Sequence, residues 1–357
     1  MRIHDLDTPA LIVDLDIMER NLQRMADYAA AHSLRLRPHT KTHKIPALGA
    51  QQIALGAVGL TVAKSTEAEV MVNSGTSDLL IAYPVLGAQK LERIRAVVKK
   101  TKITISVDSV EVAQQLSDAG LEVGVMAETD VGLGRVGVEP GVALVALAKA
   151  ISRMPGLTFQ GVAFYPGHIK STDAAGLAAI AELGARLLSI RADLTQAGID
   201  APIFSGGSTP TMWHSHEVAV MNEIRPGTYI FNDRNTVLTG ACKLEDCAAS
   251  ILCTVVSTSV KDQFIIDGGS KTFSSDGSKE PGHGWVVEHR DSVFVKMNEE
   301  HGYVSLPGAN SKLKLGERVR VIPNHICVAV NLHEKIYGVR GEEVEEVWPV
   351  EGRGKLQ

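Results

Sequence analysis

Short apolar or β-branched segments alternate with longer segments of helical period from about residue 30 to residue 235. The short segments predict eight strands, over residues 34–38, 59–63, 78–83, 102–108, 122–128, 159–165, 202–205 and 223–229. The longer segments predict helices, over residues 18–32, 88–99, 110–119, 142–154 and 173–197. In the first helix, Met18, Leu22, Met25 and Ala29 form one apolar stripe. This alternation is typical of successive parallel β/α units.

Eight β/α units favour a closed (β/α)8 barrel of the TIM type, because no glycine-rich dinucleotide turn follows the first strand. After about Leu238 helical periodicity disappears, and turn residues separate short predicted strands. These strands cover residues 250–260, 263–267, 284–288, 292–296, 318–330 and 335–339. We therefore expect a barrel over residues 8–237 and a C-terminal all-β domain over residues 238–357. Ala10–Asp14 resembles one more strand, so residues 1–14 are candidates for pairing with the β domain.

Composition and charge indicate a cytoplasmic protein with a small-molecule substrate. The hydrophobic share of 45% is enough to bury a sizeable core. A formal net charge of −5, with no long Lys/Arg run, argues against nucleic acid or an anionic membrane as a partner. Acidic residues occupy the place where a secretory signal has its apolar core, and no apolar run is long enough to span a bilayer. Four cysteines are too few for a disulfide scaffold, so we expect reduced thiols.

A lysine stands where a β/α barrel carries its catalytic groups, at the C-terminal ends of the strands. The first predicted strand closes with the segment Arg37–Lys44, which contains Lys41. A lysine at a barrel mouth can lose its proton through desolvation and nearby cations, and then form an imine. The alternative from this segment alone is a solvated basic loop.

Glycine and hydroxyl residues follow the seventh and eighth predicted strands, where barrels most often bind phosphate. The first loop offers Ser205, Gly206, Gly207, Ser208 and Thr209. The second offers Gly227, Thr228 and Tyr229. Either glycine pair could simply form a turn. Together with an upstream lysine, however, the two loops predict a phosphate-bearing cofactor with an aldehyde that reacts with lysine, which is pyridoxal phosphate.

The segment Arg37–Lys44, the loop Ser205–Pro210 and the segment Pro323–Cys327 occur in this order. Their combination resembles the D-threonine aldolase and D-serine dehydratase family, relatives of alanine racemase, over nearly the whole chain. The resemblance implies a pyridoxal-phosphate barrel with a C-terminal β domain, a homodimer, and Lys41 as the lysine that binds the cofactor. It also implies that Tyr165 lies near the cofactor ring and that Arg135 lies near the phenolic oxygen of the cofactor.

His325 and Cys327 are candidate metal ligands. They flank Ile326 in a strand-like run, so we expect both side chains on one face. Imidazole with thiolate suits zinc best, and a site completed by water and substrate oxygen would also accept manganese. Taken alone, such a pair is more often packing than ligation, but the family resemblance favours a divalent metal. Family aldolases also occur with aspartate at the cysteine position, which leaves the metal open.

With Lys41, His325 and Cys327 as catalytic residues, the resemblance implies cleavage of D-threonine-like β-hydroxy D-amino acids to glycine and an aldehyde. One alternative is a D-serine or D-3-hydroxyaspartate dehydratase that gives a 2-oxo acid and ammonia. A metal-free amino-acid racemase and a non-enzymatic cofactor carrier are further alternatives. His39 and His43 either tune Lys41 or make structural hydrogen bonds, and His168 is either a base or a turn residue.

Overall fold

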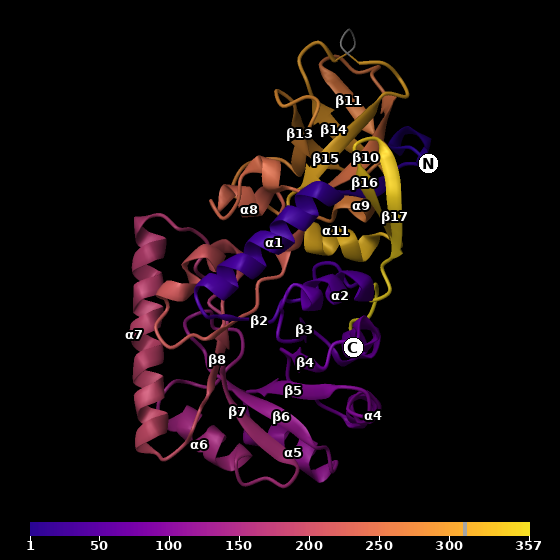
Figure 1. Ribbon diagram of the computed structural model, residues 1–357. Coiled ribbons are helices and arrows are strands. Elements are labelled where there is room, and N and C mark those ends of the chain that lie inside the picture. Colours follow the sequence, from indigo (N-terminus) through magenta and orange to yellow (C-terminus); the bar gives the residue numbers. More distant parts are fainter. Residues whose placement is uncertain (310–312) are drawn as a thin grey trace. The chain divides into compact units, whose positions relative to one another are not determined.

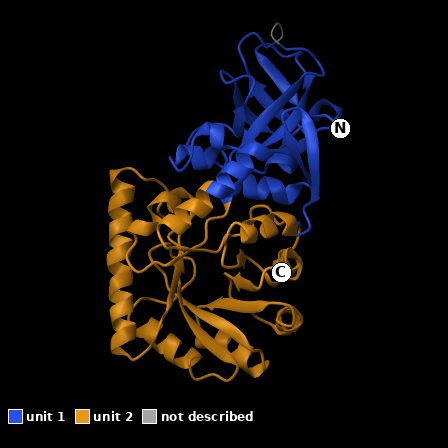
Figure 2. Ribbon diagram, viewed as in Figure 1, with its two compact units in different colours: residues 1–23, 228–353 blue, residues 24–227, 354–357 orange. Residues whose placement is uncertain are grey.

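The chain forms two compact units in the computed structural model, which describes residues 1–309 and 313–357 (Figure 2). Residues 24–227 and 354–357 make up one unit, here called the barrel unit. Residues 1–23 and 228–353 make up the other, here called the β unit. Helix α1 (Leu15–Ala31) starts in the β unit and ends in the barrel unit. No helix of the described residues combines the length and the apolar character needed to cross a membrane.

Eight parallel strands form the sheet of the barrel unit, in the order β2-β9-β8-β7-β6-β5-β4-β3 (Figure 1). They are β2 (Arg35–Leu36), β3 (Leu60–Val62), β4 (Asp78–Ile81), β5 (Lys102–Val107), β6 (Val123–Glu128), β7 (Leu157–Ala163), β8 (Ile203–Gly206) and β9 (Glu223–Ile224). A parallel bridge from His39 to Thr61 joins the two ends of this order. Each predicted strand is present, and the predicted barrel with a separate β domain is confirmed.

The helices of the barrel unit follow its strands. They are α2 (Pro46–Ala54), α3 (Ser65–Met71), α4 (Ala88–Val97), α5 (Val110–Asp118), α6 (Val142–Ile151) and α7 (Ala174–Gln196). Local sequence sets several starts: the side chain of Ser109 accepts the N–H of Val112, and that of Asp173 accepts the N–H of Gly176. The sequence predicted α1 and α4 to α7, but it did not predict the short helices α2 and α3.

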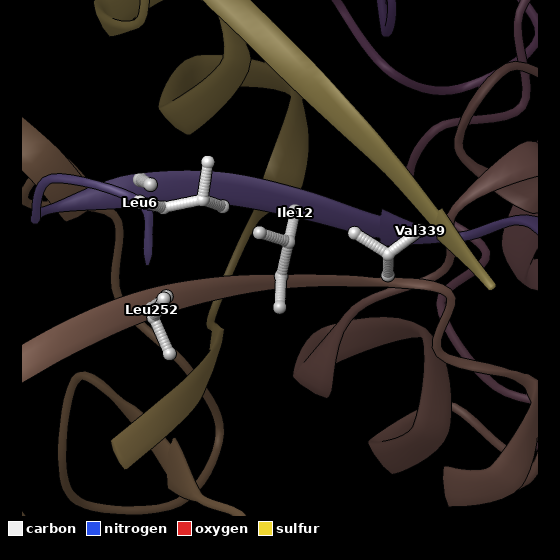
Figure 3. Close-up of a cluster of buried hydrophobic side chains, with 5 residues drawn as sticks. Leu6, Ile12, Leu252 and Val339 are labelled. Carbon is white, nitrogen blue, oxygen red and sulfur yellow. The ribbon is translucent and has the colours of Figure 1, made fainter. Parts of the chain in front are cut away.

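The β unit consists mainly of antiparallel strands, with β1 inserted among strands from the other end of the chain. The strands are β1 (Ala10–Asp14), β10 (Ala249–Ser257), β11 (Gln263–Ile266), β12 (Gly284–Val286), β13 (Val293–Met297), β14 (Gly302–Ser305), β15 (Arg318–Pro323), β16 (Lys335–Arg340) and β17 (Glu343–Pro349). Strand β1 pairs antiparallel with β10 and parallel with β16. Leu6, Ala10, Ile12, Leu252 and Val339 form a buried cluster there (Figure 3). The sequence did not predict β14 and β17.

The predicted strand over residues 318–330 is wrong in its second half. Strand β15 ends at Pro323, and helix α11 (Ile326–Leu332) begins after His325. Its buried residues Ile326, Ala329 and Val330 follow helical spacing. An apolar run of this length is ambiguous between strand and helix. Helical structure therefore continues beyond Leu238, in α9 (Ser270–Phe273) as well as in α11, whereas α8 (Arg234–Leu238) ends at that residue.

Candidate functional site

Lys41 lies in a turn after β2 and is exposed, whereas Thr40 and Thr42 on either side are buried. The turn is fixed at both ends. The N–H of Thr40 donates to the carbonyl of Thr61 over 2.8 Å, and the carbonyl of Thr40 accepts the N–H of Lys44 over 2.7 Å. No hydrogen bond or ion pair engages the Lys41 ammonium within residues 1–309 and 313–357. The amine is therefore presented on a well-ordered turn.

The two predicted phosphate loops meet this turn. His39 donates its N–H to the carbonyl of Pro226 over 3.0 Å, and Gly227 donates its N–H to the hydroxyl of Thr209 over 3.3 Å. A Cβ on Gly227 would lie 2.9 Å from the carbonyl oxygen of His39 and 2.9 Å from the hydroxyl of Thr42. Glycine is thus required for the close approach, and the structure brings together residues 39–42, 206–209 and 225–227.

The loop after β8 presents bare, buried backbone N–H groups. Gly207 and Ser208 are buried, and no described residue accepts a hydrogen bond from either backbone N–H. Gly207 has a φ of 83°, and a Cβ on Gly206 would lie 2.2 Å from the Phe164 ring. Buried N–H groups without an acceptor are costly, so they indicate an anion as partner. The phosphate of pyridoxal phosphate fits this loop.

The hydroxyl of Ser205, a residue predicted to bind the cofactor, is hydrogen-bonded to two buried residues of the barrel unit. Its hydroxyl donates to Glu223 Oε1 over 2.7 Å and accepts from Arg225 Nη1 over 2.5 Å. Arg225 also donates to the carbonyl of Phe164 over 3.0 Å. Burial lowers the pKa of Arg225. Sequence reasoning missed Arg225 and Glu223 as site residues, although Arg225 directly follows the eighth strand.

Arg135 and Tyr165 lie together. The guanidinium carbon of Arg135 is 4.8 Å from the centroid of the Tyr165 ring. Oδ1 of Asp130 accepts the N–H groups of Gly132, Leu133 and Gly134, and so folds the loop that leads to Arg135. These hydrogen bonds outweigh the burial that opposes ionisation, and they lower the pKa of Asp130. The loops after β6 and β7 thus bring both predicted ring contacts to one place.

The histidines of the Lys41 turn have separate roles. Burial, with the charges of Lys41 and Arg225, holds the pKa of His39 well below its usual range, so this imidazole is neutral. His43 is fully buried; its Nδ1 accepts the N–H of Ile45, and its Nε2 lies 3.3 Å from Oε1 of Gln52. Burial lowers the pKa of His43 to about 4. These contacts favour the structural reading of His43.

His325 and Cys327 lie at the start of α11, not in a strand, so the predicted alternation does not explain their placement. Their side chains nevertheless interact. The charge of Cys327, together with the hydrogen bond to Asp233, outweighs the burial that opposes protonation and raises the pKa of His325 to about 11. Nδ1 of His325 lies 3.0 Å from Oδ2 of Asp233. The sulfur of Cys327 lies 3.6 Å from the hydroxyl of Thr228. Thr228, predicted to bind the cofactor, therefore contacts the predicted metal pair, and Tyr229 is buried in the β unit.

A divalent metal fits this pair only as an open site. Within the described residues, no group of three or more His, Cys, Asp or Glu side chains could hold a metal ion. The carboxylate of Asp233 occupies Nδ1 of His325, so only Nε2, on loss of its proton, could ligate a metal ion. The neighbouring Cys327 would supply a soft thiolate as second ligand. Water and substrate oxygen would have to complete the coordination.

The remaining cysteines are structural. Within the described residues, none of the four cysteines takes part in a disulfide. A hydrogen bond with Cys242, followed by burial, raises the pKa of Cys247. Burial raises the pKa of Cys253. Such thiols are poor nucleophiles and poor metal ligands.

Comparison with known proteins gives matches along nearly the whole chain. Residues 13–235 match the alanine racemase N-terminal domain, and residues 248–339 match the putative serine dehydratase domain. The 3-hydroxy-D-aspartate aldolase of Paracoccus denitrificans is 34% identical, over 98% of this chain and 93% of its own. The crystal structure of D-threonine aldolase from Filomicrobium marinum is 32% identical, with a TM-score of 0.94 over 100% of this chain and 98% of that chain.

A third relative is the D-threo-3-hydroxyaspartate dehydratase of Delftia sp. HT23. Its structure is 31% identical, with a TM-score of 0.86 over 98% of both chains. Two further similar structures are of a D-threo-3-hydroxyaspartate dehydratase, one as a histidine-to-alanine variant and one, in a metal-free form, as a cysteine-to-alanine variant. All three relatives are named as lyases.

Proposed function

We propose that this chain, which belongs to the alanine racemase-like family of D-threonine aldolases and D-serine dehydratases, is a lyase with Lys41 as its cofactor-binding lysine. The family depends on pyridoxal phosphate. One observation carries the assignment of the site: the exposed Lys41 turn meets a loop whose buried N–H groups lack an acceptor among the described residues.

Each part of the barrel site has a task in this proposal. Pyridoxal phosphate held in this site would supply an electron sink for the bond that breaks at the α-carbon of the substrate. The N–H groups of Gly207 and Ser208, with the hydroxyl of Thr209, would hold its phosphate. Tyr165 and Arg135 would contact the ring and its phenolic oxygen. Neutral His39 adds no further positive charge beside Lys41 and Arg225.

His325 and Cys327 would hold the divalent ion, zinc or manganese. An ion there would supply Lewis acidity to the β-hydroxyl of the substrate, which lowers the pKa of that hydroxyl. Asp233 would keep Nε2 of His325 directed at the ion.

For the reaction we favour cleavage of D-threonine-like β-hydroxy D-amino acids to glycine and an aldehyde. Two relatives named as aldolases, at 34% and 32% identity, support this choice. Cleavage requires the Cα–Cβ bond to stand perpendicular to the cofactor ring, whereas dehydration requires the Cα–H bond there. The D-series preference comes from the names of the relatives. A cytoplasmic location and a homodimer belong to the same proposal.

Dehydration to a 2-oxo acid and ammonia is the second candidate. The histidine and the cysteine that are altered in the two dehydratase variants are two positions apart, as His325 and Cys327 are here. A His-x-Cys pair is therefore compatible with a dehydratase as well.

The test is to incubate the purified protein, loaded with pyridoxal phosphate and either zinc or manganese, with D-threonine, D-3-hydroxyaspartate and D-serine. Glycine with acetaldehyde from D-threonine supports the aldolase. Pyruvate from D-serine, or 2-oxobutyrate with ammonia from D-threonine, supports the dehydratase. Racemisation that a chelator does not inhibit would contradict both. Borohydride reduction followed by peptide mapping must place the cofactor on Lys41, and label elsewhere would overturn the site assignment.

A further inference from the structure

A second lysine stands three positions after Lys41, and its surroundings are the opposite. Lys44 is buried, and its ammonium lies 2.8 Å from Oε1 of Glu67, whose side chain is also almost fully buried. The other carboxylate oxygen of Glu67 accepts the N–H of Ala63 over 2.6 Å. Glu67 lies on α3, and Ala63 directly follows β3. The ion pair therefore ties the Lys41 turn to the next β/α unit of the barrel.

The backbone at Lys44 adds to this observation. Lys44 has a φ of 57°, a left-handed conformation that residues with a Cβ rarely adopt. Such a conformation persists only where surrounding contacts hold it. Here the N–H of Lys44 donates to the carbonyl of Thr40 over 2.7 Å, which closes the turn around Lys41. The ion pair to Glu67 holds the side chain of the same residue.

The two lysines thus differ in their readiness to react with an aldehyde. Attachment joins a lysine nitrogen to the aldehyde carbon and releases one water, and it needs an amine with a free electron pair. Attachment at Lys44 would have to break its buried ion pair with Glu67, which is costly to lose. Lys41 is exposed, and no described residue engages its amine by hydrogen bond or ion pair.

We propose that Lys44 and Glu67 form a positioning pair, which fixes the turn that presents Lys41 and reserves cofactor attachment for Lys41 alone. This inference rests on the proposed function, because it assumes that pyridoxal phosphate attaches in this turn. Neither residue touches the cofactor; both act through the placement of Lys41.

The experiment uses the full-length wild type and the Glu67→Gln variant. Each is loaded with pyridoxal phosphate, its dissociation constant is measured by absorbance, and the attachment site is mapped after borohydride reduction. Glutamine keeps an acceptor for Ala63 but removes the carboxylate that holds the Lys44 side chain in its ion pair. We expect label on both Lys41 and Lys44, and affinity for the cofactor lower by about tenfold because the turn is less fixed.

A second variant guards against a folding defect. Lys44→Met combined with Glu67→Leu removes both charges, a replacement that buried ion pairs often tolerate. We expect it to fold, to carry label on Lys41 only, and to bind the cofactor about tenfold more weakly. Glu300→Gln is the matched control, because Lys271 and Glu300 form an exposed pair of the same type at 2.7 Å. It should bind the cofactor as the wild type does.

The outcomes separate the two claims. Wild-type affinity in both variants, with label on Lys41 alone, would overturn the positioning pair and leave the proposed function in place. Wild-type protein without label on Lys41 would overturn the proposed function, and the pair with it. Circular dichroism checks that each variant is folded.

Discussion

At the scale of single residues, Gly167 sets the orientation of the Tyr165 ring. A Cβ at position 167 would lie 2.3 Å from Cε1 of Tyr165, so Gly167→Ala must displace the ring. We predict that this variant folds and binds pyridoxal phosphate about tenfold more weakly, because a displaced contact residue costs orientation. Titration by absorbance measures the effect. Gly277→Ala is the control, since a Cβ there meets nothing within 4 Å; equal affinities of the two variants would refute the role of Tyr165.

Asp233 is the second residue whose role can be isolated. Its carboxylate holds Nδ1 of His325 and also accepts the N–H groups of Ile326 and Thr236. Asp233→Asn keeps an oxygen acceptor but loses the charge. Losing such an outer carboxylate typically weakens metal binding by about 10 to 100-fold, and we expect that change in a zinc competition titration. Bound pyridoxal phosphate should keep its absorbance. Unchanged zinc affinity would show that Asp233 only caps helices.

At the scale of elements, β1 stabilises the β unit from the opposite end of the chain. Ile12 is 2% exposed and packs among Leu6, Leu252 and Val339 (Figure 3). We predict that Ile12→Ala lowers the free energy of unfolding by about 2 to 5 kcal/mol, because it leaves a cavity in this cluster. Urea denaturation measures the loss. A change under about 1 kcal/mol would mean that the cluster collapses around the smaller side chain.

The elements also show what the sequence could predict. The barrel strands were readable because each is a short apolar run bounded by turns, and Lys41 and the phosphate loops follow from strand order. Helix α11 was not readable as a helix. Its start depends on the N–H of Ile326 meeting the carboxylate of Asp233, a residue 93 positions away in the chain. For the same reason Asp233, Arg225 and Glu67 escaped notice, because their importance lies in contacts between distant segments.

At the scale of the whole molecule, the pH dependence of unfolding reports on the fully buried His43. Its pKa is about 4 in the folded protein, against an ordinary value of 6.5, because burial disfavours the charged ring. Between these values the unfolded chain binds a proton that the folded chain excludes. The stability that neutral His43 contributes is therefore complete above pH 6.5 and is lost as the pH falls toward 4.

We predict that this single histidine costs the wild type about 3 kcal/mol of unfolding free energy between pH 6.5 and pH 4. His43→Gln retains an N–H donor for Gln52 but cannot take up a proton, so the variant should be less stable than the wild type at pH 7 and should lose less as the pH falls. Urea denaturation of both proteins from pH 7 to pH 4 measures the two slopes. His39 also has a lowered pKa, mainly through burial and the charges of Lys41 and Arg225, which both proteins share; the charge of His43 is a smaller cause, so most of the His39 contribution cancels in the difference. Parallel curves for the two proteins would mean that His43 takes up its proton in the folded state as readily as in the unfolded chain.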